Sequence, residues 1–140
     1  MRKPPLALLV AALLLPLSAC SDDGTGNEDD PGYFGTYELR TVNGSALPFT
    51  LLDNPVQKVE IIRGSIVVRA DGTFTDGLEY RVTPAGGTAA PSDDVVIGTF
   101  LESAGSLVFN TSDGATYSVL LTANGGLSQE IDEYVLVYGR

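Results

Sequence analysis

Asp and Glu are the residues of this chain whose side chains could best take part in catalysis. Its 140 residues include 18 Asp+Glu and 8 Lys+Arg, but no His and a single Cys. The absence of His excludes Ser-His-Asp and Cys-His machinery, and also an imidazole base or metal ligand. One Cys allows neither an intrachain disulfide nor a Cys-based zinc site. The net charge of −10 argues against nucleic acid as a partner, because phosphate binding needs clustered Lys and Arg.

Two acidic groups are the candidates for a reactive or cation-binding site. Asp93 and Asp94 are adjacent, and paired carboxylates can do acid–base work when their pKa values are driven apart. No third group accompanies them, which favours a solvated strand start. Glu130, Asp132 and Glu133 could hold a surface cation, although acidic turns of this kind are common. We expect no catalytic residue, no metal site and no cofactor, since an enzyme would have to work with carboxylates and tyrosines alone.

A mostly aromatic set of side chains is the candidate ligand-binding surface. These residues could line an apolar pocket in which tyrosine hydroxyl groups orient a ligand. The alternative is that they fill a solid core, as in many small eight-stranded barrels. The candidate residues are Tyr37, Leu39, Phe74, Tyr80, Phe100, Phe109 and Tyr117.

The elements that must position these residues are β-strands. From Gly32 onward, short β-branched and aromatic runs alternate with turn residues, and no stretch shows helical periodicity. Dipeptides that tolerate a positive φ favour tight hairpins. Several strands at short spacing predict an antiparallel barrel or sandwich. The turn dipeptides are Asn43-Gly44, Asp71-Gly72, Asp76-Gly77, Asp113-Gly114 and Asn124-Gly125.

Eight strands are expected, and several alternate apolar and polar residues as antiparallel sheets with one buried face do. Residues Pro84–Ser92 are expected to form a loop, and a short extra pairing is expected near Leu127. The last expected strand is apolar on both faces, so it is either central or covered by another element. The expected strands are Phe34–Val42, Val56–Ile62, Ser65–Ala70, Thr73–Thr83, Val95–Leu101, Ser106–Asn110, Thr116–Thr122 and Ile131–Tyr138.

The first residues have the form of a bacterial export signal. Arg2 and Lys3 precede an apolar run from Leu6 to Leu17, which is shorter than the about 20 residues of a membrane-spanning helix. The run ends in Leu17-Ser18-Ala19-Cys20, which resembles the lipobox of bacterial lipoproteins. The resemblance implies cleavage after residue 19 and acylation of Cys20 with palmitate-type chains, which would give a stable membrane anchor. Ser21 in the next position resembles the sorting signal for the outer membrane, with the side of that membrane left open.

The chain therefore divides into a signal peptide over 1–19, a lipidated tether over 20–31 and one β domain over 32–140. The tether has no large apolar residue and carries five acids, so it cannot bury enough surface to offset its ordering entropy. We expect it to be a disordered spacer between the membrane and the domain.

The β domain resembles the lipocalin-like domains of small bacterial lipoproteins. The likeness rests on the opening Gly35–Pro48, on the hairpin Arg69–Phe74, and on the closing strand Tyr134–Tyr138. It implies an up-and-down barrel of about eight strands whose interior can hold one small ligand, with a β-sandwich as the alternative. The opening is also similar to META-type domains, but the Gly-Cys-Asn segment of that family is missing here.

These observations predict a monomeric, non-enzymatic lipoprotein of the bacterial cell envelope. It would be anchored by its lipid and would bind a small apolar or amphipathic ligand. The alternative is a structural or interaction lipoprotein that contacts an envelope protein or a glycan.

Overall fold

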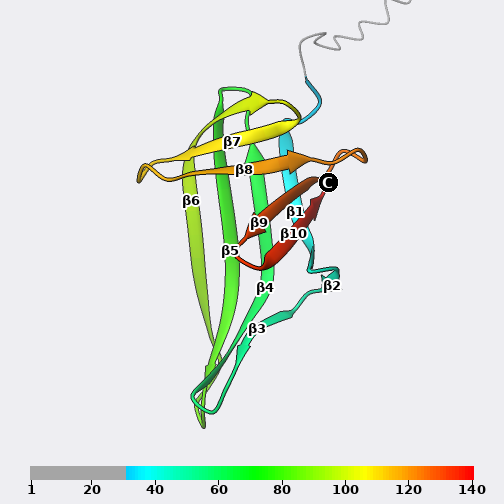
Figure 1. Ribbon diagram of the computed structural model, residues 1–140. Coiled ribbons are helices and arrows are strands. Elements are labelled where there is room, and N and C mark those ends of the chain that lie inside the picture. The colour runs from blue at the N-terminus through cyan, green and yellow to red at the C-terminus, as the bar shows by residue number, and fades with distance from the viewer. Residues whose placement is uncertain (1–30) are drawn as a thin grey trace, which may run out of the picture.

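The computed structural model describes residues 31–140, and this part of the chain is built almost entirely of antiparallel strands (Figure 1). It contains no helix long and apolar enough to cross a membrane. The predicted signal peptide 1–19, the predicted lipidation site Cys20 and all but the last residue of the predicted tether 20–31 lie outside the described residues. The strands are β1 Gly35–Val42, β2 Ser45–Ala46, β3 Phe49–Asp53, β4 Gln57–Val68, β5 Thr73–Pro84, β6 Ala90–Ser103, β7 Ser106–Thr111, β8 Thr116–Leu121, β9 Leu127–Ile131 and β10 Tyr134–Gly139.

Eight of these strands form a closed barrel. Strands β4 to β10 follow one another as a meander in which each strand pairs with the next. Strand β1 closes the ring, because its first half pairs with β4 and its second half with β10. The short strands β2 and β3 are additions that pair with β1 and β4, respectively. The predicted all-β, eight-stranded, up-and-down barrel is thus confirmed, and the alternative sandwich is wrong.

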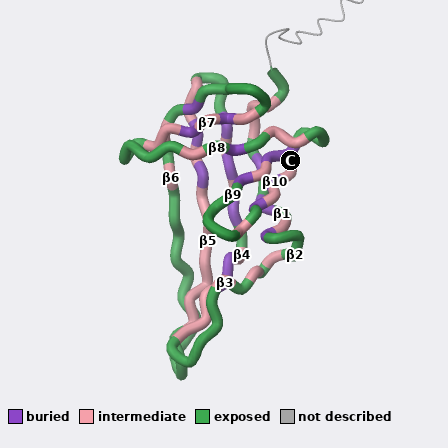
Figure 2. Tube along the Cα trace, in the orientation of Figure 1, coloured by how far each residue is buried: buried purple, intermediate pink, exposed green. Residues whose placement is uncertain are grey.

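The three longest strands, β4, β5 and β6, continue past the barrel as a tapering sheet that is mostly exposed at its tip (Figures 1 and 2). Strand β7 pairs only with residues 98–103 of β6, so the first half of β6 has a neighbour on one side only. Pro91, Asp93 and Asp94 lie in this half. Proline and charged side chains are typical protection of a free strand edge against pairing with another chain.

Several expected boundaries are wrong, each for a local reason. The expected strands Val56–Ile62 and Ser65–Ala70 are one strand, β4, with a register irregularity between Ile61 and Arg63. Gly64 does not break it, because the place of its missing side chain is taken by Leu78 and Leu39. The expected loop Pro84–Ser92 is only a short turn, since β6 already begins at Ala90.

Two further corrections concern turns. Asp76-Gly77 is not a turn but the middle of β5, where both residues pair with β4 and with β6. The expected last strand from Ile131 to Tyr138 is interrupted by a turn at residues 132–133, so Ile131 belongs to β9 and β10 begins at Tyr134. The extra pairing expected near Leu127 is confirmed as β9.

Aromatic packing fills one half of the barrel interior. The rings of Phe74 and Phe109 stack with centroids 4.0 Å apart, and Phe100 lies edge-on to Phe109 at 6.2 Å. Tyr33 and Phe34, just before β1, pack their rings against Phe100 and so cover this end of the core. Figure 2 shows that the buried residues lie mainly within the barrel, while the tip of the tapering sheet is exposed.

The candidate ligand-binding residues divide between this core and the opposite half. Five are buried in the core, and two are only half-buried. The buried residues are Tyr37, Leu39, Phe74, Phe100 and Phe109, and the half-buried residues are Tyr80 and Tyr117.

Candidate functional site

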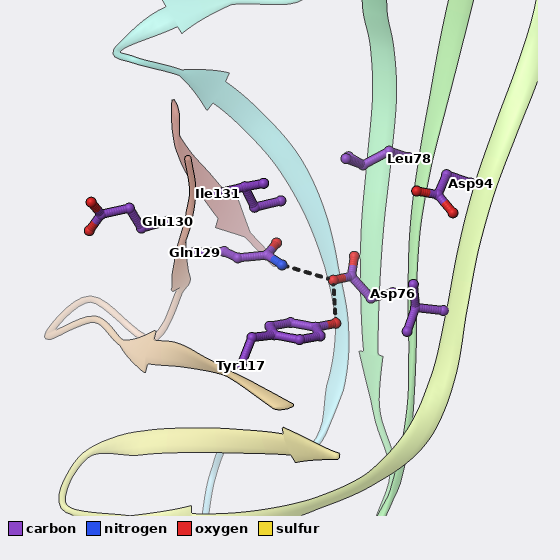
Figure 3. Close-up of a pocket in the computed structure, with 8 residues that line it drawn as sticks. Asp76, Leu78, Asp94, Tyr117, Gln129, Glu130 and Ile131 are labelled. Carbon is purple, nitrogen blue, oxygen red and sulfur yellow. Dashed lines mark hydrogen bonds between the residues drawn. The ribbon is translucent and has the colours of Figure 1, made fainter. Parts of the chain in front are cut away.

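A cavity of about 270 Å³ lies in the less filled half of the barrel, between β5 and β6 on one side and β8 and β9 on the other (Figure 3). It lies beside the half of β6 that β7 does not cover. Its walls combine aliphatic and polar side chains. The lining residues are Asp76, Leu78, Asp94, Val96, Tyr117, Gln129, Glu130 and Ile131.

The alternation of β5 and β6 brings the main lining residues together. Phe74, Asp76, Leu78 and Tyr80 are two residues apart, so they share the inward face of β5. On β6, Val96 pairs with Asp76 and Asp94 pairs with Leu78, so these two residues face inward as well. The register of one strand pair thus puts two carboxylates and two aliphatic side chains on one wall of the cavity.

Asp76 is the centre of the polar part of the cavity. It is 7% exposed, and its Oδ2 accepts a hydrogen bond of 2.7 Å from the Tyr117 hydroxyl group and one of 3.1 Å from Nε2 of Gln129 (Figure 3). Gln129 is itself buried, and its Oε1 accepts a hydrogen bond of 3.1 Å from the Tyr138 hydroxyl group. These bonds connect β5, β8, β9 and β10 across the barrel and fix the carboxylate in place.

The environment of Asp76 disfavours its charged form. Burial raises the pKa of this carboxyl above its ordinary value of 3.8, and the charge of Asp94 acts in the same direction. The hydrogen bonds from Tyr117 and Gln129 lower the pKa of Asp76 but do not cancel the effect of burial. Burial, followed by the charge of Asp76, also raises the pKa of Tyr117 and of Tyr138, so both hydroxyl groups keep their protons and act as donors.

A second cavity of about 200 Å³ borders the first. The two share Leu78 and Ile131 in their linings, so they lie side by side in the open half of the barrel. The second cavity is mostly apolar, and it contains the candidate residue Tyr80. Its lining residues are Leu51, Ile61, Leu78, Tyr80, Ile131, Asp132, Tyr134 and Leu136.

The structure separates the acidic pair Asp93 and Asp94. Asp94 faces the cavity on the inward side of β6, while Asp93 pairs with Glu79 and lines a depression on the outer surface of the barrel. The pair is in the interior of β6 and not at a strand start. Two carboxylates do approach the same cavity, but they are Asp76 and Asp94 from neighbouring strands.

The second acidic cluster lies at the turn between β9 and β10. Glu130 lies at the edge of the cavity, with its carboxylate turned away from Asp76 (Figure 3). Asp132 has a φ of 53° in the turn and contributes to the lining of the second cavity. Within residues 31–140, no group of three or more side chains is arranged to hold a metal ion.

Sequence reasoning did not identify Asp76 and Gln129 as site residues. The signal for Asp76 was its position two residues after Phe74 and two before Leu78. In a strand, this spacing puts its carboxyl group on the same face as these apolar side chains. The Asp-Gly dipeptide suggested a turn instead. Gln129 lies in β9, for which the sequence offered only the apolar Leu127 as a clue.

Chemically, the cavity is amphipathic. The cavity offers aliphatic side chains, one buried carboxylate held by hydrogen bonds from two other strands, and a second, exposed carboxylate on the same wall. Comparisons with protein-family models, with curated proteins and with solved structures find no match to this chain.

Proposed function

We propose that this protein is a lipid-anchored binding module of the bacterial cell envelope that takes a small amphipathic ligand into the open half of its barrel. The observation that carries the proposal is the cavity around Asp76, in which a fixed carboxylate lies beside aliphatic walls. Ligand pockets typically combine apolar lining with a few placed polar groups. The packed aromatic core of the other half would then serve as a rigid support for the site.

The family and the anchor belong to the same proposal. An up-and-down barrel of eight strands is the architecture that the lipocalin-like resemblance implies, and this agreement supports that family. The lipobox-like sequence at Cys20 supports a lipid anchor, and Ser21 in the next position supports sorting to the outer membrane. Replacing Cys20 by Ser should move the chain from the membrane fraction to the soluble fraction of its host. Retention of the variant in the membrane would contradict a lipid anchor at this residue.

The binding function is tested by native mass spectrometry of the full chain, purified gently from its own host. We expect a co-purifying small molecule whose mass disappears on denaturation. The variant Val96→Phe, which fills the cavity from β6, should lose that molecule. Its matched control is Ile97→Phe, because Ile97 is the next residue on β6 and is 54% exposed on the outer face.

Two outcomes would contradict the binding function. A wild-type protein without any bound molecule would argue against a resident ligand. Equal retention by Val96→Phe and Ile97→Phe would show that the molecule binds elsewhere.

A second candidate function is interaction with another envelope component through the outer face of β6. Three large apolar side chains lie on this face: Val95 is 61%, Ile97 54% and Leu101 68% exposed. An apolar strip of this kind can mark an interaction site. Replacing Ile97 and Leu101 by Ser should then abolish crosslinking to an envelope protein or glycan while leaving ligand retention intact.

A further inference from the structure

The charge of the cavity limits the chemistry of its ligand. Asp76 and Asp94 face it, Glu130 lies at its edge, and no Lys or Arg of residues 31–140 lines it or the neighbouring apolar cavity. All basic side chains of the described residues have hydrogen-bonding or ion-pair partners in the barrel. These residues are Arg40, Lys58, Arg63, Arg69, Arg81 and Arg140. An anionic ligand would therefore meet repulsion with no compensating cation.

Asp76 differs from the other buried carboxylate of residues 31–140. Glu60 is equally buried, but it accepts hydrogen bonds from two cations, Lys58 and Arg81, each at 2.9 Å. Within the described part of the chain, Asp76 has only the neutral donors Tyr117 and Gln129. A buried carboxylate without a cation is costly, and a bound cation is the partner that would relieve that cost.

One oxygen of Asp76 is available for such a partner. Both hydrogen bonds end on Oδ2, and Oδ1 accepts none from residues 31–140. No fully buried side-chain oxygen or nitrogen in this part of the chain lacks a partner, which means that Oδ1 keeps contact with the cavity space. Figure 3 shows this oxygen turned away from Tyr117 and Gln129.

The surroundings of Asp76 favour an organic cation over a metal ion. Calcium takes six to eight oxygen ligands, and magnesium needs a near-octahedral oxygen shell. Beside Asp76, the cavity offers the aliphatic side chains of Leu78, Val96 and Ile131. The adjoining cavity adds Leu51, Tyr80 and other apolar groups, so there is room for an apolar body next to the charged group.

We propose that the ligand is an amphipathic amine, with its protonated ammonium group donating to Oδ1 of Asp76 and its apolar part extending past Leu78 and Ile131 into the second cavity. This inference rests on the proposed function, since it names the ligand class of the same site. Asp94 adds a second negative charge opposite the ammonium group. Hydrogen bonds between ionised partners are about twice as strong as neutral ones, which makes the charge the main determinant of selectivity.

The test compares three probes of equal chain length: hexylammonium, hexanol and hexanoate. Each is titrated into the full chain at pH 7.5 by isothermal calorimetry. We expect hexylammonium to bind at least tenfold more tightly than hexanol, and hexanoate to bind least. Asp76→Asn should weaken the binding of hexylammonium at least tenfold and leave the affinity for hexanol unchanged. Asp93→Asn is the matched control, because it removes the same charge from the outer face, and it should leave all three affinities unchanged.

The outcomes distinguish the ligand class from the site. If hexanol binds as tightly as hexylammonium, or if Asp76→Asn does not weaken the binding of hexylammonium, the proposed recognition of an amine is wrong. The binding site itself is still supported if Val96→Phe abolishes the binding of hexanol. If Asp93→Asn weakens hexylammonium as much as Asp76→Asn does, the amine binds only through the overall negative charge. If none of the three probes binds, both the ligand class and the proposed function are contradicted.

Discussion

Replacing Asp76 by Asn should stabilise the folded protein at neutral pH, although it removes a hydrogen-bonded side chain from the interior. The carboxylate is 7% exposed, and burial is the largest of the causes that raise its pKa. Asn has nearly the same shape and keeps a carbonyl oxygen that can accept from Tyr117 and Gln129. The substitution therefore removes the buried charge and retains its hydrogen-bonding partners.

The size of the gain depends on two opposing effects of the substitution. Hydrogen bonds to a charged group are about 1–1.5 kcal/mol stronger than neutral ones, so weakening two of them costs about 2–3 kcal/mol. The effective penalty for burying a carboxylate is several kcal/mol. Because the pKa of Asp76 is raised, the burial penalty outweighs the hydrogen bonds that favour the charged form. We expect a net gain on the order of 1 kcal/mol, or about 4 °C in Tm for a domain of this size.

The pH dependence identifies the cause of the gain. The pKa of Asp76 in the folded protein lies above the ordinary value of 3.8, so between the two values the folded state binds more protons than the unfolded state. The stability of the wild type therefore falls as the pH rises through this window. The variant lacks this loss. Its advantage should be complete above the folded-state pKa and should vanish below pH 3.8.

Urea unfolding of the wild type and Asp76→Asn at about pH 7.5 and about pH 3 measures both the gain in stability and its pH dependence. Asp93→Asn serves as the control for a change of net charge, because Asp93 is exposed and should change stability by less than about 0.5 kcal/mol. A variant that is less stable than the wild type at the higher pH would refute the reasoning. So would a difference between them that is the same at both pH values.

Four further substitutions test the packing of the barrel by urea unfolding at neutral pH. Tyr117→Phe removes the 2.7 Å hydrogen bond to the buried Asp76 and should cost about 1.5–3 kcal/mol; an unchanged stability would show that this bond is not made in solution. Gly98→Ala would place a Cβ against the Asn110 carbonyl oxygen and 2.9 Å from Cε1 of Phe74, and should cost about 3 kcal/mol. Gly77→Ala has its nearest contact at 3.7 Å and should stay within about 0.5 kcal/mol, so equal losses at both glycines would contradict the strand packing. Phe109→Ala opens the fully buried centre of the core and should cost about 3–5 kcal/mol, whereas a loss below about 1 kcal/mol would mean that this half of the barrel is not packed.

The barrel could be predicted from the sequence because its signals are local. Alternation places Phe74, Leu78 and Tyr80 on one face, and turn dipeptides such as Asp71-Gly72 mark the hairpins. Closure of the ring could not be derived in this way. It depends on pairing between β1 and β10, which lie at opposite ends of the domain's sequence, and the strand pattern carries no signal for it. The resemblance to lipocalin-like domains supplied it instead.

The site was harder to predict because it depends on three-dimensional neighbours. Asp94 was noticed for its adjacency to Asp93, yet the relevant partner is Asp76 on the next strand. The partners of Asp76 come from other strands: Tyr117 and Gln129 donate to it, and Tyr138 donates to Gln129. The sequence pattern alone could not predict the register irregularity in β4 near Ile62. It also could not predict that the Leu78 side chain packs against Gly64.

The pairing of β1 with β10 also sets the order in which the fold can be completed. Strands β4 to β10 form by successive hairpins between neighbours in the chain, and such local contacts form early. β1 is the first of these strands to emerge from the ribosome, but one side of its second half remains unpaired until β10 is available. The ring can therefore close only as the final step. A chain whose closing strand is made last keeps the ring of the barrel open until its synthesis is complete.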